Sequence, residues 1–320
     1  MTYNRFLVTI FIIIEIIFIV SYKANVEGLI NNASSNSEIM NILNNELSLY
    51  SNSEFRGRVA SIFINKDNDG SWSGNYIGDI NRIQLFKNDY RGISLLKYGV
   101  PTLFEYNQMN NPLLHHFVRN YLSNQKDKQE RNILNISKIN IKFLKELGVT
   151  HLITNKKITD DNLKFKSLEE KSNEKVFLYK ISDPIFYLEK INLYDNIYST
   201  DSFGAIVDVD HKFAHLNKTA VSFAAPNYVR LNINQYGFSV KAKSTVNSLA
   251  LLPIQFSNCL SFKKNMNIKL IRVNFILTGF IFNGEIDDVI NLEVGLLNNQ
   301  LCKNKDYDDS KYLLSYLTNQ

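Results

Sequence analysis

Cysteine is scarce in this chain, which has two cysteines, Cys259 and Cys302, among 320 residues. Two isolated cysteines form no Cys-x-x-Cys pair, and no His/Cys cluster of the chain has the ligand spacing of a zinc site. They permit one disulfide in an oxidising compartment but do not require it. The sequence therefore excludes a zinc module of the common spacings and leaves the redox compartment open.

Glycine-rich motifs and nucleophile motifs are missing as well. The chain has no G-x-G-x-x-G, no G-x-x-x-x-G-K-[ST] and no G-x-S-x-G elbow. Without a glycine-rich turn the backbone cannot approach a pyrophosphate closely. The formal net charge is +5, but basic pairs such as Lys156-Lys157 and Lys263-Lys264 are short and typical of a solvated surface. Nucleotide binding and nucleic-acid binding are therefore not expected.

One long apolar run is present near the N-terminus, from Phe6 to Tyr22 (FLVTIFIIIEIIFIVSY). As a helix it is about 25 Å long, close to the ~30 Å core of a bilayer. Tyr3 and Lys23 extend it with side chains that reach the interface. The alternative is a cleavable signal peptide, but its apolar stretch is usually shorter, and no A-x-A-like site follows the run. We predict an uncleaved transmembrane anchor over residues 1–24.

Glu15 lies near the middle of this apolar run. An ionisable side chain at that depth is costly unless it is neutralised, paired or turned toward a protein neighbour. One interpretation is that it is tolerated in a protonated or snorkelling form. The other is that the helix packs against membrane helices of a different chain, which predicts a polytopic partner.

Three further regions follow from the patterning. Residues 25–54 are predicted to be a linker and a short helix, because a polar stretch precedes an amphipathic run from Ile39 to Tyr50. Residues 55–200 alternate predicted strands and helices, which indicates a small α/β layer domain. Residues 215–300 contain many short apolar segments separated by turn residues, which is typical of an antiparallel β-sandwich. Residues 301–320 form a C-terminal tail with a short helix.

The clearest local unit is KFLKELGVTHLITN, from Lys142 to Asn155. Its pattern predicts a helix from Asn132 to Leu147, a stop at Gly148 and a strand from Thr150 to Thr154. Together the segments predict an α+β protein with an N-terminal transmembrane helix, an α/β layer domain and a β-sandwich.

One segment has part of the spacing of a calcium loop. In NKDNDGSWSGNY, from Asn65 to Tyr76, oxygen-bearing side chains occupy positions one, three and five, and Gly70 occupies position six. Position twelve, which should carry a bidentate glutamate, is Tyr76, and the flanking helices are missing. A turn at Asp69-Gly70 after a strand is the favoured interpretation.

Two other groups of possible metal ligands are weaker still. In DVDH, from Asp208 to His211, a strand would place His211 on the face opposite both aspartates. Adjacent His115 and His116 would point about 100° apart on a helix. We therefore predict no catalytic residue, no metal site and no cofactor-binding residue.

Several stretches in the same order resemble one family. They are NDYRGISLLKYGVPTLFEYNQM (Asn88–Met109), KFLKELGVTHLIT (Lys142–Thr154), KVFLYKISDPIFYLEKI (Lys175–Ile191), APNYVRLNI (Ala225–Ile233), LALLPIQFSN (Leu249–Asn258) and IRVNFILTGFIF (Ile271–Phe282). They are similar to the extracytoplasmic portion of YfhO-like bacterial membrane proteins, which belong to the polytopic GT-C-type glycosyltransferases. The likeness covers about residues 55 to 297. The family's catalytic core lies in many membrane helices that this chain lacks, so no active-site residue is carried over, and a Pro-Gly-Trp of the family is replaced by Ser257-Asn258-Cys259.

The resemblance implies a membrane-anchored extracytoplasmic module of a glycosyltransferase-like system in a bacterial cell envelope. Such a module would not be catalytic by itself; it would position a lipid-linked sugar or a glycan while a polytopic partner chain supplies the chemistry. Trp72, Tyr76 and Tyr106 offer rings that stack on sugars if they are exposed, although aromatic residues more often pack in a core. The alternative is a free-standing anchored module that binds carbohydrate or protein.

Overall fold

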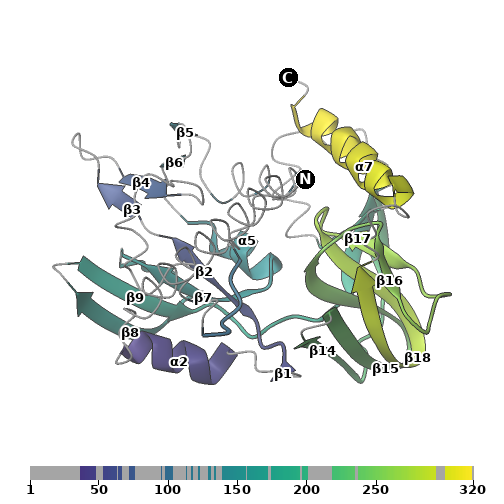
Figure 1. Cartoon of the computed structure of the whole chain (residues 1–320), viewed down its shortest axis with the longest axis horizontal. Coiled ribbons are helices and arrows are strands. Elements are labelled where there is room, and N and C mark those ends of the chain that lie inside the picture. The colour runs from purple at the N-terminus through teal and green to yellow at the C-terminus, as the bar shows by residue number, and fades with distance from the viewer. Residues whose placement is uncertain are drawn as a thin grey trace, which may run out of the picture.

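The computed structural model of the chain is built mainly from strands (Figure 1). It describes residues 37–47, 53–62, 64–66, 72–75, 95, 98–103, 113, 117, 122, 129–130, 133–134, 139–155, 157–171, 174–194, 197–200, 218–234, 237–292 and 300–318. These residues form eighteen strands and three helices. The predicted α+β class is therefore wrong, because the described part of the protein is mostly β.

The predicted transmembrane helix, within residues 1–24, lies outside the described residues. Among the helices that the structure describes, none is long and apolar enough to cross a membrane.

The larger sheet has ten strands and curls into a half-barrel. Eight strands follow the order β1-β14-β15-β18-β17-β12-β11-β13, while β10 pairs with β15 and β16 pairs with β18. Their bounds are β1 (Ser53–Glu54), β10 (Tyr187–Leu188), β11 (Lys190–Tyr194), β12 (Ile197–Thr200), β13 (Lys218–Ser222), β14 (Tyr228–Asn234), β15 (Gly237–Gln255), β16 (Leu260–Phe262), β17 (Leu270–Val273) and β18 (Leu277–Leu292). The sheet thus combines strands from the region predicted as α/β with strands from the region predicted as a sandwich.

Two long bent strands explain why this sheet curls instead of forming the predicted two-layer sandwich. β15 and β18 pair along nearly their whole lengths, with breaks in register after Ser244 and after Leu252 of β15. Such bulges increase the local twist and bend of a strand pair. Gly284 of β18, which pairs with Ser244, has a φ of +97°, a conformation that glycine adopts without strain. One apolar cluster of this sheet contains Phe262, Phe280 and Phe282, whose rings pack on one another.

The second sheet has four strands in the order β2-β7-β9-β8. They are β2 (Arg58–Ile62), β7 (Val149–Thr154), β9 (Glu174–Lys180) and β8 (Lys164–Lys171), and only β2 and β7 are parallel. Helix α2 (Glu38–Leu47) packs on one face through Ile39, Leu43 and Leu47, which share a cluster with Ile153 and Leu178 of the sheet. A third, small sheet joins β3 (Ile64–Lys66), β4 (Trp72–Asn75), β6 (Ile133–Leu134) and β5 (Gln129–Glu130).

The other face of the four-stranded sheet is covered by α5 (Ile141–Glu146). The predicted helix, glycine stop and strand are confirmed here: α5 ends before Gly148, whose φ is +76°, and β7 follows. The helix is shorter than predicted, because the Asn140 side chain caps it by accepting a hydrogen bond from the Phe143 N–H. A side chain at Gly148 would meet the ring of Pro253 in β15 at 2.8 Å, so the two sheets approach closely at this point.

One apolar cluster is shared by both sheets. It unites residues of α5 and β7, such as Phe143 and Leu152, with residues of the ten-stranded sheet, such as Tyr194, Val273 and Leu277. The C-terminal helix α7 (Gln300–Thr318) is much longer than the predicted short helix of the tail, and it lies beside β17 and β16 (Figure 1). It is joined to the sheet by a disulfide between Cys259 and Cys302.

Candidate functional site

Most of the residues weighed from the sequence as ligands lie outside the described part of the chain. This holds for Glu15, for Asp67, Asp69, Gly70 and Tyr76 of the calcium-like segment, for His115 and His116, for Asp208, Asp210 and His211, and for Tyr106. Asn65 and Trp72 lie in β3 and β4, which pair as an antiparallel hairpin. Within the described residues, no group of three or more His, Cys, Asp or Glu side chains is placed to hold a metal ion.

The structure instead brings together a histidine and a glutamate that the sequence does not connect. His151 of β7 faces α2 and is 2% exposed, and its Nε2 lies 3.0 Å from Oε2 of Glu46, 105 residues earlier in the chain. Its Nδ1 lies 3.1 Å from Oγ1 of Thr150, and Nζ of Lys166 lies 2.9 Å from Oε1 of Glu46. We call Thr150, His151, Glu46 and Lys166 the His151 cluster.

The His151 cluster suits a neutral imidazole. Burial lowers the pKa of His151 to about 4, and the opposing effect of the Glu46 carboxylate is too small to reverse this. Burial alone would raise the pKa of Glu46, but the hydrogen bonds and charges of Lys166 and His151 outweigh it and lower that pKa. A neutral ring donates from Nε2–H to Glu46 and accepts at Nδ1 from the Thr150 hydroxyl, so both ring nitrogens are satisfied.

A hydroxyl, a histidine and a carboxylate linked by hydrogen bonds are also the parts of a hydrolytic triad. Here, however, the hydroxyl is not accessible to a substrate. Thr150 is buried, and a side chain added at Gly57 would lie 2.2 Å from its Oγ1. A catalytic hydroxyl must meet a substrate carbonyl, which needs open space beside it. The cluster therefore fastens α2 to the sheet and presents no nucleophile to a ligand.

A second polar group, the Glu146 junction, links α5 to the ten-stranded sheet. It consists of Glu146, Thr200 of β12 and Asn274, which follows β17. Oε2 of Glu146 accepts hydrogen bonds from the Thr200 hydroxyl at 3.1 Å and from Nδ2 of Asn274 at 3.3 Å. Oδ1 of Asn274 in turn accepts from the Thr200 N–H at 2.9 Å. Burial raises the pKa of Glu146, more than these hydrogen bonds and the charges of Lys142 and Lys145 lower it.

The backbone beside this junction has an uncommon conformation. Asn274 and Phe275 have φ values of +47° and +63°, although neither is a glycine. Left-handed residues of this kind cost free energy and are held by their surroundings. Here the surroundings are the hydrogen bonds of Asn274 and the rings of Tyr194 and Phe117 that pack on Phe275. Of the three polar groups, the Glu146 junction most resembles a functional site. Its hydrogen-bonding atoms face one another, however, so it joins α5 to the ten-stranded sheet.

A third group holds α7 in place. Arg272 of β17 donates to Asp309 at 3.0 Å and stacks over the ring of Phe256 at 4.5 Å. Asp306 accepts hydrogen bonds from the side chain of Ser257 and from the backbone and side chain of Asn258. With the adjacent disulfide, these contacts fix one side of α7 to β17 and to the segment between β15 and β16.

Sequence reasoning missed all three groups because their members are brought together only by the fold. His151 looks like an ordinary polar position of a strand, and Glu46 looks like the solvated side of an amphipathic helix. A local signal is that His151 is the one ionisable residue of a strand whose residues are all buried.

Comparison with known proteins gives no further identification. No protein-family model, no curated protein and no solved structure matches this chain.

Proposed function

We propose that this chain is an extracytoplasmic module, held at the membrane by its N-terminal apolar segment, that positions a lipid-linked sugar or a glycan for a polytopic partner chain. The module itself is not catalytic in this proposal, and the glycosyl transfer takes place in the partner. The resemblance of its sequence to the exterior portion of YfhO-like membrane proteins suggested this function.

The observation that carries the proposal is the disulfide between Cys259 and Cys302. These are the chain's two cysteines, and both are used. Disulfides form and persist outside the cytosol, where thiols are not kept reduced. A bonded pair in a chain with an N-terminal apolar run supports a location on the outer side of the membrane.

The polar groups of the described residues support a binding rather than a chemical role. The His151 cluster, the Glu146 junction and the contacts of Arg272 each join two elements of the fold. Together they give a stiff body from which loops can be presented to a ligand.

The location is tested by labelling the cysteines from outside. Intact cells stripped of their wall are treated with a membrane-impermeant reductant and then with a membrane-impermeant maleimide. We expect Cys259 and Cys302 to be labelled only after reduction and without lysis. Labelling that requires lysis would place the folded part in the cytosol and contradict the proposal.

The partner is tested by purification of the full chain from membranes in mild detergent. We expect a polytopic protein to co-purify with the wild-type chain and with the control Ile14→Leu, and to be reduced with Glu15→Leu. A chain that purifies alone favours the alternative of a free-standing binding module. Sugar transfer by the purified chain alone, well above background, would contradict both.

A further inference from the structure

A basic loop with an apolar tip extends from the ten-stranded sheet between β16 and β17. The loop, Lys263–Lys269 (KKNMNIK), carries three lysines and no acidic residue. All three lysine side chains are exposed, and Met266 is 82% exposed. The other apolar residue of the loop, Ile268, packs against the core of the half-barrel. We call this segment the basic tip.

The basic tip is fixed by the fold. The buried carboxylate of Asp288 in β18 accepts hydrogen bonds from the N–H groups of Lys264 at 3.0 Å and Asn265 at 2.7 Å, and from the Asn265 side chain at 3.0 Å. The Ile268 N–H donates to the Asn265 carbonyl at 3.0 Å, which closes a turn with Met266 at its first central position. Met266 is thus held outward by a turn that is already ordered in the folded protein. Binding through Met266 therefore requires little further loss of conformational entropy in this loop.

The charge of the basic tip is not cancelled by its neighbours. Asp288 is 1% exposed and its oxygens are engaged by backbone N–H groups, so it offsets one of the three lysine charges from beneath the loop. The two exposed carboxylates of β18 have lysines of β15 as partners: Asp287 pairs with Lys241 at 3.1 Å and Glu285 pairs with Lys243 at 3.7 Å. The three lysines of the tip therefore present a net positive surface around a thioether.

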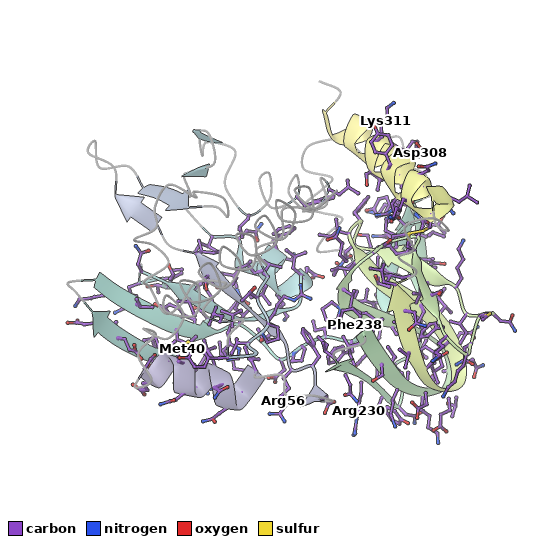
Figure 2. The ribbon with its side chains drawn as sticks, in the orientation of Figure 1. Met40, Arg56, Arg230, Phe238, Asp308 and Lys311 are labelled. Atoms are coloured by element: carbon purple, nitrogen blue, oxygen red, sulfur yellow. A yellow bond between two sulfur atoms is a disulfide. The ribbon has the colours of Figure 1, made fainter. Side chains whose placement is uncertain are left out.

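The exposed side of α7 makes a useful contrast. It also carries an exposed apolar residue, Leu301, and exposed lysines, but these alternate with acidic residues such as Asp308, which lies on the helix with Lys311 (Figure 2). Mixed charge of this kind gives little attraction to an anionic surface. Of these two surfaces, the basic tip is the one that combines an outward apolar side chain with charge of one sign.

We propose that the basic tip is a second membrane contact, in which Met266 enters the headgroup region of an anionic bilayer while Lys263, Lys264 and Lys269 bind lipid phosphates. A lysine suits this place because its ammonium reaches the phosphates from a long apolar stem. A soluble polyanion would satisfy the lysines but would offer no hydrocarbon to Met266, so a bilayer matches both features. This inference rests on the proposed membrane location, and it adds a contact that is independent of the N-terminal segment.

The test is peroxide footprinting of the methionines during vesicle flotation of the full chain. One set of vesicles contains phosphatidylcholine alone, and the other contains a large fraction of phosphatidylglycerol. We expect Met266 oxidation to slow about fivefold or more on the anionic vesicles only, because three lysines, each favouring the bound state about fivefold, keep the tip mostly bound. High salt should restore the rate. Met40, a buried residue of α2, serves as the internal control.

The matched variants change the same charge in two places. The triple variant Lys263→Glu, Lys264→Glu, Lys269→Glu should abolish the protection of Met266. The triple variant Lys303→Glu, Lys305→Glu, Lys311→Glu on α7 should leave it unchanged. Equal loss of Met266 protection in both variants would mean that the net charge of the whole chain, and not the basic tip, drives the contact. That result would overturn the proposal.

The outcomes separate this inference from the proposed function. Flotation with both vesicle types and protection only on anionic ones supports both. Flotation with both types but no protection overturns the basic tip and leaves the N-terminal attachment standing. Flotation with anionic vesicles alone, with protection, supports the tip and contradicts that attachment, and flotation with neither overturns both. Equal protection by a soluble acidic polysaccharide would overturn the bilayer as the partner.

Discussion

In the four-stranded sheet the most buried titratable group is a histidine held by other side chains, whereas in the ten-stranded sheet it is an aspartate held by the backbone. His151 depends on Glu46 and Thr150. Asp288 accepts from the N–H groups of Lys264, Asn265 and Val289, which outweigh its burial and lower its pKa. Mild acid should therefore act first on the four-stranded sheet, while the ten-stranded sheet depends on its aromatic core and its disulfide.

The largest effect is expected in the core of the half-barrel. Phe280 is fully buried, and its ring lies 5.1 Å from that of Phe262 and 5.3 Å from that of Phe282. Phe280→Ala should lower the free energy of unfolding by about 4 kcal/mol at any pH, because a large cavity forms. Denaturant unfolding measures the loss, and Phe165→Ala, at an exposed aromatic of β8, is the control with a small effect. Equal losses would show that the core assignment is wrong.

The next effect is expected from the disulfide. The double variant Cys259→Ala, Cys302→Ala opens a link between residues 43 positions apart, which should cost about 3 kcal/mol. Hydrogen exchange should show that α7 loses protection while α2 keeps it. Reductant should have no further effect on the double variant. Loss of protection in α2 as well would indicate that both regions depend on this link.

The third effect is expected from acid. The folded-state pKa of His151 is about 4, below its ordinary value of 6.5, so the unfolded chain binds the proton more strongly between these values. Stability should therefore fall as the pH falls, by about 2 kcal/mol between pH 7 and pH 5. Glu46 adds to the loss only below its ordinary pKa. In His151→Gln, which keeps a donor for Glu46, most of this slope should vanish, and an unchanged slope would assign it to another group.

The local rules of the sequence predicted one element pair well. Gly148 separates a helix from a strand because only glycine accepts its positive φ there without strain. The start of that helix was misplaced, since Asn140 caps it and the preceding Ile133–Leu134 forms a strand. A β-branched or apolar residue next to polar residues fits the pattern of a helix and that of a strand. Whether a partner strand pairs with it decides between the two.

The half-barrel was beyond local rules. The sequence predicts separate short strands in FSVKAKST (Phe238–Thr245) and SLALLPIQFS (Ser248–Ser257), where β15 is one strand with two bulges. A residue that ends a strand and one that bends it have the same local chemistry. The three polar groups were missed for a related reason, since partners such as Glu46 and His151 are distant in sequence.

The pairing of β1 with β14 has a consequence for how the protein is made. Ser53 pairs with Ile233 and Glu54 pairs with Asn232, so the first strand of the large sheet must wait until most of the polypeptide has left the ribosome. Such long-range pairing slows folding. Cys302 arrives later still, and during this interval the nascent chain exposes strand edges that a chaperone would have to shield.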